Sequence, residues 1–213
     1  MPSTNSSANI FKGALVSSSL LEGSTVIPFQ YNPASMQRSL TPNMSGGEEQ
    51  DRTLSIMYKG PPTQTINVSI EFDAATGLNS GASTEVQNGV YAQLAALELL
   101  LTPTTTDLLA SQALLATGVM EITPFATPSI YFVWGPARVL PVKITQYAVT
   151  EELFDAHLNP IQATIALTMR VLNCNDVSVT NKAYQQYITY QQKMEQIAPL
   201  AHGSSAVTGA SFN

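Results

Sequence analysis

Two stretches of this 213-residue chain alternate between apolar and polar residues, and this alternation constrains the fold more than any other feature. The first is TQTINVSIEF, residues 63–72, in which every second residue from Ile66 to Phe72 is apolar. The second comprises residues 138–154 and 161–172, which are joined by the turn DAHLNP. Because successive side chains of a strand point to opposite faces, a period of two predicts half-buried strands. We therefore predict a long antiparallel hairpin over residues 138–172 in a mainly β fold.

Shorter apolar runs predict further strands at residues 9–21, 25–31 and 129–135. Pro28 lies inside the second of these runs, which predicts an edge strand, because proline cannot donate to a β ladder. Asn32-Pro33 ends that strand, and Gly60-Pro61-Pro62 predicts a firm break after a short strand at residues 54–59.

Two segments have helical spacing. Residues 86–101 carry apolar residues on one face, namely Val90, Leu94, Leu97 and Leu101. Residues 182–197 form a Tyr- and Gln-rich segment that ends before Pro199, and one of its faces carries Tyr184, Tyr187, Ile188 and Gln191. Residues 102–127 include a short helical pattern at 107–115, and two readings stay open: an outlying element that touches a neighbour, or a long, partly helical loop. The fold class is therefore α+β, mainly β with one flanking helix and a C-terminal helix.

The chain divides into three parts by composition. Residues 1–24 comprise a flexible Ser/Asn/Thr-rich start and a first strand, and residues 25–173 form the main β domain. That domain carries a polar arm at residues 34–62, with an acidic loop at Glu48, Glu49 and Asp51, and a helical insert at 86–127. Residues 174–213 form a C-terminal helical extension with a loose tail.

The chain has few charges. Charged residues make up 11% of the sequence, against roughly 25% in an average soluble domain, and the net charge is −6. A protein surface with so few charges is easier to understand if other subunits bury much of it. Alternatively, hydroxyl and amide groups could keep a monomer soluble. The absence of a basic stripe argues against binding to nucleic acid or to an anionic membrane.

The chain start does not resemble a signal peptide, and no apolar stretch approaches the roughly 20 residues that span a bilayer. We therefore expect no direct membrane insertion. With a single cysteine, Cys174, synthesis in a reducing cytoplasm fits best.

Residues suited to catalysis are sparse and poorly grouped. His157 lies in a turn beside Asp155, but no nucleophile motif accompanies this pair, and His202 lies in the tail. Cys174 has no nearby cation in sequence to favour its thiolate. The acidic loop lacks the ligand spacing of a calcium site. We expect no catalytic residues, no bound metal and no cofactor.

Four blocks in order resemble the tube-type baseplate proteins of contractile injection systems, the phage-tail-like machines of bacteria. These blocks are FQYNP at residues 29–33, INVSIEFD at 66–73, YFVWG at 131–135 and the hairpin TEELFDAHLNPIQATIALTMRVL at 150–172. Many relatives carry a LysM module, for which residues 174–213 are too short.

The resemblance implies two packed antiparallel sheets that form a small barrel similar to that of inner-tube subunits. It also implies a homo-hexameric ring that joins the spike or hub of the baseplate to the inner tube, with tube, spike, hub and baseplate proteins as partners. The assembled particle would lie in the cytoplasm, at a membrane or outside the cell. A tube subunit or a tube-end cap stays open, as does a monomeric β-barrel that binds sugar or peptide through the aromatic residues 131–134. On the ring hypothesis we expect the interface to include Phe29, Tyr31, Asn32, Pro33, Arg38, Trp134, Tyr147, Tyr184 and Tyr187.

Overall fold

The structure is a computed structural model that describes residues 11–19, 23–45, 57–75, 87–116, 125 and 127–201. Within these ranges the strands are β1 (Ala14–Ser19), β2 (Gly23–Pro28), β3 (Met36–Ser45), β4 (Met57–Asp73), β5 (Ser129–Val133), β6 (Val139–Phe154) and β7 (Pro160–Val171). The helices are α3 (Tyr91–Glu98), α4 (Thr105–Ala116) and α5 (Lys182–Ile197), followed by the short 3-10 helix η1 (Ala198–Ala201). The predictions of a flexible start at residues 1–8, of an acidic loop at Glu48, Glu49 and Asp51, and of a loose tail beyond residue 201 fall on residues that the structure does not describe.

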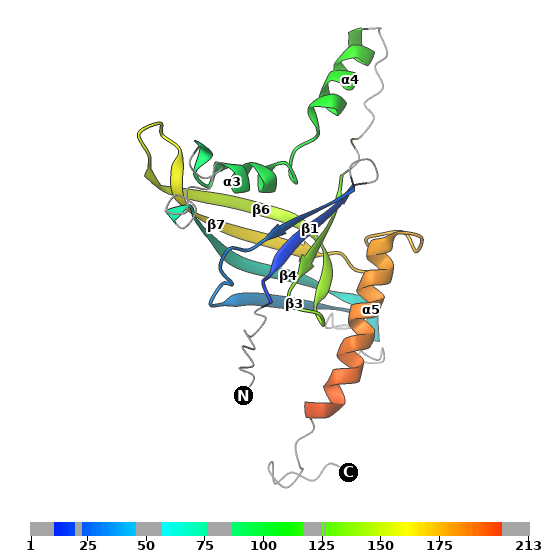
Figure 1. The fold of residues 1–213 in the computed structure, drawn as a ribbon. Helices are drawn as coiled ribbons and strands as arrows, with labels where there is room; N and C mark the ends of the chain where they lie inside the picture. The colour runs from blue at the N-terminus through cyan, green and yellow to red at the C-terminus, as the bar shows by residue number, and fades with distance from the viewer. Residues whose placement is uncertain are drawn as a thin grey trace, which may run out of the picture.

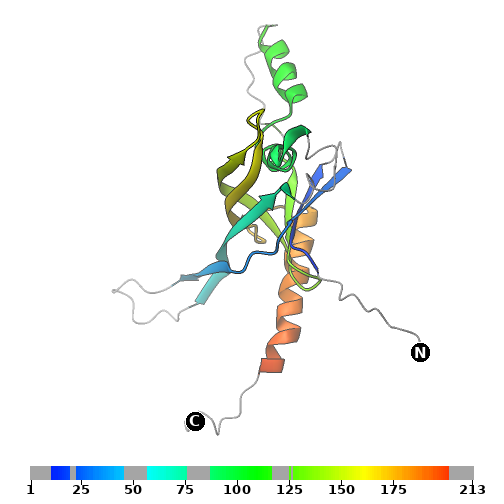
Figure 2. The ribbon, with the colours of Figure 1, turned by 60° about the vertical axis from the view of Figure 1, so that its left-hand side comes forward.

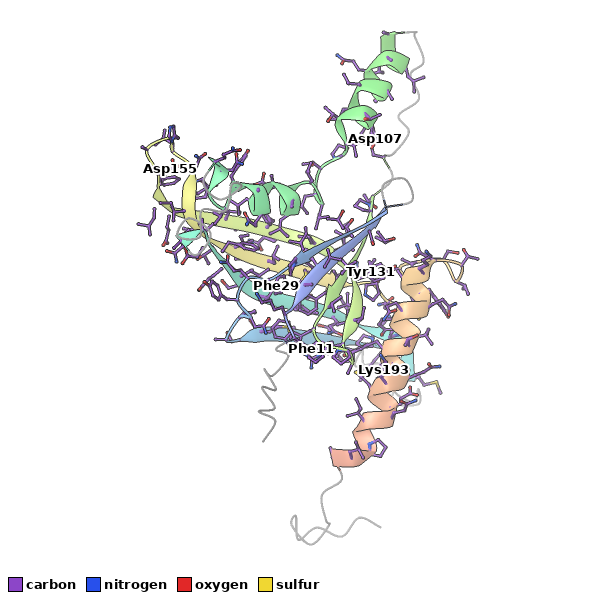
Figure 3. The ribbon with its side chains drawn as sticks, viewed as in Figure 1. Phe11, Phe29, Asp107, Tyr131, Asp155 and Lys193 are labelled. Atoms are coloured by element: carbon purple, nitrogen blue, oxygen red, sulfur yellow. The ribbon has the colours of Figure 1, made fainter. Side chains whose placement is uncertain are left out.

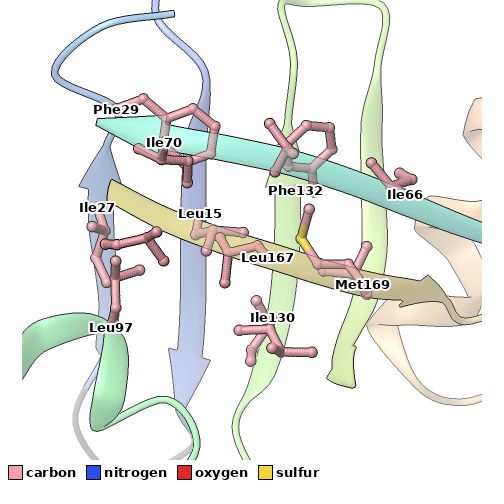
Figure 4. Packing of buried hydrophobic residues seen from close by; sticks show 14 of the residues in the cluster. Leu15, Ile27, Phe29, Ile66, Ile70, Leu97, Ile130, Phe132, Leu167 and Met169 are labelled. Atoms are coloured by element: carbon pink, nitrogen blue, oxygen red, sulfur yellow. The ribbon is translucent and has the colours of Figure 1, made fainter. Parts of the chain in front are cut away.

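The described strands form a single seven-stranded antiparallel sheet in the order β2-β1-β5-β6-β7-β4-β3. The sheet bends strongly, so that β4 and β7 cross over β1 and β5 with apolar side chains between them (Figures 1 and 4). The mainly β, α+β class is confirmed. In place of two separate packed sheets, one curved sheet folds over its own core, and it is not closed into a barrel because β2 and β3 remain as its two edges.

The long hairpin is confirmed, since β6 and β7 pair from Val142↔Val171 to Phe154↔Pro160. The predicted alternation also holds in β4, where the four apolar residues from Ile66 to Phe72 are all buried. Their side chains meet those of β7 and of the crossing strands in one core (Figure 4). The largest fully buried side chains are Phe29, Phe132, Leu15, Ile66, Ile70, Leu94, Leu97, Leu140, Ile165, Leu167, Met169 and Val90.

The predicted break at Gly60-Pro61-Pro62 is wrong, because β4 runs through it from Met57 to Asp73. The strand tolerates the prolines because β7 pairs with β4 only from Thr65 onward, which leaves that side of residues 57–64 without a strand to donate to. On the other side, the register with β3 shifts on both sides of Asn43, opposite the prolines. The polar arm is therefore largely a β-hairpin, and its far half projects beyond the body of the sheet (Figure 2).

The helices differ in how they attach to the sheet. The predicted helix at 86–101 is shorter, because α3 ends at Glu98 and Leu101 is exposed, whereas Val90, Leu94 and Leu97 are buried as expected. Helix α5 has the predicted bounds and begins at Asn181, whose side chain accepts a hydrogen bond from the Ala183 backbone N–H. Its buried residues are Ala183, Tyr187 and Tyr190, which is a different set from the predicted face. Helix α4 confirms the helical pattern at 107–115.

Candidate subunit interface

The two edges of the sheet are the first candidate surfaces for contact with another protein. Strand β2 is one edge, which confirms the prediction made from Pro28, and Val26 in this strand is 58% exposed. Strand β3 is the other edge, and most of its residues are exposed. An edge strand presents unpaired backbone N–H and C=O groups that can pair with another chain. The chain therefore carries two such edges, at opposite ends of the strand order.

The FQYNP block serves mainly to lock the end of β2 to the start of the chain. The Asn32 side chain accepts from the Gly13 backbone N–H at 2.9 Å and donates to the Phe11 carbonyl at 2.8 Å. Phe29 is fully buried, and a Cβ added at Gly13 would lie 2.7 Å from the rings of both Phe29 and Trp134. A glycine at position 13 thus allows the backbone to approach these two rings closely.

Two of the nine residues expected at the interface are in the core instead. Phe29 pairs with Phe132, with ring centroids 6.3 Å apart, and no part of its side chain is exposed. Tyr187 packs in the core cluster, where burial, with Cys174 and Tyr190 as lesser causes, raises the pKa of its hydroxyl. These two expectations are corrected, because a buried ring has no free surface to offer a partner.

The other seven residues have mixed surroundings. Tyr31 is 47% exposed, and Asn32 is exposed although it is hydrogen-bonded within the chain. The half-buried ones are Pro33, Arg38, Trp134, Tyr147 and Tyr184. They are spread over the connection after β2, the edge strand, the sheet and α5, so the structure does not bring them together as one patch.

Arg38 connects the edge strand β3 to helix α5. Its Nη2 donates to the Tyr190 hydroxyl at 2.9 Å. With the Gln64 amide turned so that its oxygen faces the guanidinium, that oxygen accepts from Nε and Nη2 of Arg38 at 3.0 Å. The helix also donates to the segment around the start of β6, from the Gln186 side chain to the Val139 carbonyl and from Lys193 Nζ to the Pro136 carbonyl. Arg38 therefore makes its hydrogen bonds within the chain, where it links β3 to α5.

Tyr147 is held in its neutral form. Burial, together with the negative charges of Glu98 and Glu151, raises the pKa of its hydroxyl to about 12. A group that stays protonated at physiological pH cannot act as a base or nucleophile there. Trp134 stacks on the buried ring of Phe132, with centroids 5.9 Å apart, so this aromatic segment is tied into the core rather than displayed in a groove.

The end of the β6–β7 hairpin is an apolar surface that the sequence reasoning missed; we call it the tip (residues 153–158), and it comprises the last two residues of β6 and the turn that follows. Leu153, Phe154 and Leu158 are 64%, 51% and 80% exposed. Figure 3 shows Asp155 at this far end of the hairpin. The available signal was two adjacent apolar residues at the end of a strand and a leucine in the turn that follows, because a solvent-facing turn is ordinarily polar.

The Asp155 carboxylate organises the tip. It accepts from the His157 and Asn159 backbone N–H groups at 2.7 and 2.8 Å and from the Asn159 side-chain amide at 2.9 Å. These hydrogen bonds, first those from Asn159, lower the pKa of Asp155 below its ordinary value. The Asn159 side-chain amide also donates to the Gln87 carbonyl, which ties the tip to the segment before α3.

A hollow of about 410 Å³ lies on the projecting half of the β3–β4 hairpin and is lined by Leu40, Pro42, Tyr58, Gly60 and Pro62. We call it the hairpin hollow. Its lining is mainly apolar, and Leu40 and Tyr58 are 52% and 77% exposed. Next to it, Met57 is 62% exposed.

Helix α4 is a further apolar element without cover in the described part of the chain. None of its residues is buried, and Asp107 is its one charged residue. Its exposed leucines include Leu108, Leu109 and Leu115. Figure 1 shows the helix standing away from the sheet. An apolar helix is usually buried against something, so α4 is also suited to contact another molecule.

Where the chain is described, no group of three or more His, Cys, Asp and Glu residues could hold a metal ion. Within the same residues, no helix has the length and hydrophobicity needed to cross a bilayer. No model of a known protein family matches the chain, and no curated protein matches its sequence.

Proposed function

We propose that this protein is a structural, ring-forming subunit of a contractile injection system or phage-tail-like particle, in which it joins the spike or hub of the baseplate to the inner tube. The observation that supports this best is the open, curved sheet with two unpaired edges, β2 and β3. Pairing of β2 in one copy with β3 in the next is a heterologous contact, and such contacts close into rings when the rotation between copies closes. A hexamer is the ring size that the sequence resemblance implies.

The outer face of the sheet suits the wall of a central channel. Cross-strand neighbours on this face include the row Gln37, Asn67, Thr168 and Gln146, and the row Ser69, Ala166 and Ala148. These side chains are uncharged and short or flexible. Once neighbouring edges pair, this face would continue from subunit to subunit and complete the barrel that a single chain leaves open. Other positions of the same face carry charges, among them Arg170 opposite Lys143 and Glu71 opposite Thr164.

The exposed apolar surfaces also support a role as a subunit of a larger assembly. The tip, the hairpin hollow and α4 all present large apolar side chains to solvent, on a chain in which charged residues are only 11%. Contiguous exposed apolar patches mark contact sites in soluble proteins. These surfaces agree equally well with an inner-tube subunit or a tube-end cap of the same machine. The sugar- or peptide-binding alternative has less support, because Phe132 is fully buried and Trp134 stacks on it.

Native mass spectrometry and negative-stain microscopy test ring formation. We expect closed rings of six copies, and co-purification from the producing cell with sheath, spike and tube proteins. Val26→Lys places a charge on edge β2 and should yield monomers, because a lysine on an edge opposes strand pairing. Val179→Lys is the matched control: it changes an equally exposed valine outside both edges and should keep the ring. A wild-type chain that stays monomeric and co-purifies with none of these proteins would contradict the proposal.

A further inference from the structure

The edge strand β2 directs every second backbone unit away from the sheet. The Phe29 N–H donates to the Gly13 carbonyl at 2.8 Å, which extends the register of β1 with β2. In an antiparallel strand the N–H and C=O groups of one residue point to the same side, and this side alternates from residue to residue. Ser24 and Val26 therefore direct their backbone groups away from β1. Pro28 does the same, and it has no N–H to leave unpaired.

The same alternation identifies the free backbone groups of the other edge, β3. The Ala74 N–H donates to the Ile161 carbonyl at 2.8 Å, which extends the register of β4 with β7. The even-numbered residues of β4 from 66 to 72 therefore face β7, and the odd-numbered ones face β3. Their partners in β3 are residues 37, 39 and 41. The backbone groups that point away from the sheet are consequently those of Met36, Arg38 and Leu40.

The chain does not close its own sheet by pairing β2 with β3. The Gln30 side-chain amide accepts from the Asp73 N–H at 2.8 Å and donates to the Asp73 carbonyl at 2.6 Å, so β2 ends at the level of Asp73. Strand β3 begins only at Met36, opposite Val68 on β4. If β2 lay parallel beside β3 of the same chain, it would have to end further along β3, beyond that start. Both edges are therefore without a partner strand in the described part of the chain.

The strand order fixes the relative direction of the two edges. Every neighbouring pair among the seven strands is antiparallel, and β2 and β3 are the first and last strands of the order. In an odd number of alternating strands the first and the last run the same way. A ring contact that continues the sheet from copy to copy does not reverse either strand, so it brings β2 and β3 together in parallel. Two-fold pairing of two identical edges would instead be antiparallel.

The orientation of the side chains leads to the same direction. Val26 points to the outer face, because the next residue, Ile27, is buried in the core. Arg38 points to the inner face, because it lies opposite the buried Ile66. Both residues direct their backbone groups away from the sheet. Residues opposite each other in an antiparallel pair share both the side of their backbone groups and the face of their side chains. An antiparallel contact of β2 with β3 would therefore join the outer face of one copy to the inner face of the next.

A parallel contact keeps the outer faces continuous. In a parallel pair, a residue that directs its backbone groups at the partner strand lies beside a residue whose own groups point away from it, and the two side chains share a face. The residues of β3 that meet this condition for Val26 are Gln37, Ser39 and Thr41.

We propose that β2 of one copy pairs in parallel with β3 of the next copy, through the backbone N–H and C=O groups of Ser24, Val26, Met36, Arg38 and Leu40. This inference rests on the proposed function, which supplies a second copy as the partner. It adds the direction of the contact, the backbone groups that form it and the side chains that become neighbours. The wall of the ring then contains one parallel junction for each copy, and all of its other strand pairs are antiparallel.

Site-directed cross-linking tests the direction without knowledge of the exact register. In a Cys174→Ser background, one variant carries Ser24→Cys or Val26→Cys, and a second, differently tagged variant carries a cysteine at residue 37, 39 or 41. All five positions are exposed. The two variants are mixed as dilute monomers, concentrated to allow assembly and oxidised. We expect the cross-linking pattern of Val26→Cys to be displaced by two residues toward the C-terminus of β3, relative to that of Ser24→Cys.

The other outcomes separate this inference from the ring itself. A displacement toward the N-terminus of β3 would show an antiparallel contact and overturn the inference. Closed rings in the microscope without any mixed cross-link would also overturn it, while the ring stands. Preferential cross-linking of Val26→Cys to itself would show two-fold pairing of β2 and refute both proposals. The expected displacement in open filaments without closed rings would support the parallel contact and refute the ring.

Two proline variants of β2 test the assignment of the backbone groups. Val26→Pro removes an N–H that points away from β1, whereas Thr25→Pro removes one that points toward β1. Val26→Pro should weaken association by about 10-fold or more, because a hydrogen bond of the junction is lost, and leave the dilute monomer close to wild type in urea denaturation. Thr25→Pro is the matched control and should destabilise the monomer. Equal destabilisation of the monomer by both variants, or undiminished association of Val26→Pro, would overturn the assignment.

Discussion

Replacing Leu158 by glycine should stabilise the isolated subunit, although it removes a large apolar side chain. Leu158 is 80% exposed and has a φ of 64°, so its side chain contributes little burial while its backbone is strained. The left-handed conformation costs an L-residue about 1–2 kcal/mol, and glycine avoids this cost. Glycine also gains conformational freedom in the unfolded chain, which offsets about 0.5–1 kcal/mol of that benefit. The net expectation is a free energy of unfolding higher by about 0.5–1 kcal/mol.

The matched control is Gly135→Ala. Gly135 has a φ of 74°, and an added Cβ would meet no atom within 4 Å, so the substitution tests the backbone cost alone. It should lower the free energy of unfolding by about 1 kcal/mol or more. Urea denaturation of dilute monomer, followed by the fluorescence of Trp134, measures both effects as shifts of the midpoint at an unchanged m-value.

A loss of stability of about 1 kcal/mol or more in Leu158→Gly would refute this reasoning. It would mean that the Leu158 side chain makes contacts within the monomer, or that residue 158 does not adopt the left-handed conformation in solution.

Three further predictions concern the core, the docking of α3 and the response of the tip to pH. Phe132→Ala removes a fully buried ring and should lower the free energy of unfolding by about 3–5 kcal/mol, measured by urea denaturation; a loss below about 1 kcal/mol would contradict the packing. Gly89→Ala should cost about 2 kcal/mol or more and increase hydrogen exchange in α3, because the new Cβ would overlap the Pro160 carbonyl oxygen and φ is 57°; the milder effect expected of Gly135→Ala serves as its reference. Because the folded pKa of Asp155 is lowered, its stabilisation of the tip is present above the ordinary pKa and is lost as the pH falls through the folded value. The amide signals of His157 and Asn159 should therefore shift in acid, and their protection from exchange relative to the intrinsic rate at the same pH should fall; an unchanged tip in Asp155→Ala at neutral pH would oppose this role.

The apolar–polar pattern of the sequence was sufficient to predict those strands and helices that have one apolar and one polar face. The alternation in residues 66–72 and 161–171 predicts the buried faces of β4 and β7, because a half-buried strand must separate its two kinds of side chain. The end of α5 before Pro199 also follows from the sequence, and the structure adds the cap at Asn181 that begins the helix.

Other features depended on neighbours that the sequence does not identify. Gly60-Pro61-Pro62 has the composition of a break, yet it stays within β4 because only β3 pairs with the strand there. Phe29 follows an edge strand and was expected at the surface, yet the bend of the sheet brings it against Phe132 in the core. In both places the local residues permit more than one outcome, and long-range pairing selects one.

For the candidate contact surfaces, too, some features follow from the sequence and others only from the tertiary structure. By itself the sequence determined a mainly β chain with few charges, an edge strand at Pro28 and a helix at 182–197, because periodicity, proline chemistry and composition act locally. Only the tertiary structure decided that the strands form one open sheet, that Arg38 binds Tyr190 within the subunit, and that an apolar tip and an apolar hollow lie at opposite ends of β4. The physical reason is that exposure is a property of the folded chain. A leucine in a turn and a leucine in a core are the same residue type in the sequence, and only packing across the sheet decides which side chain is exposed to solvent.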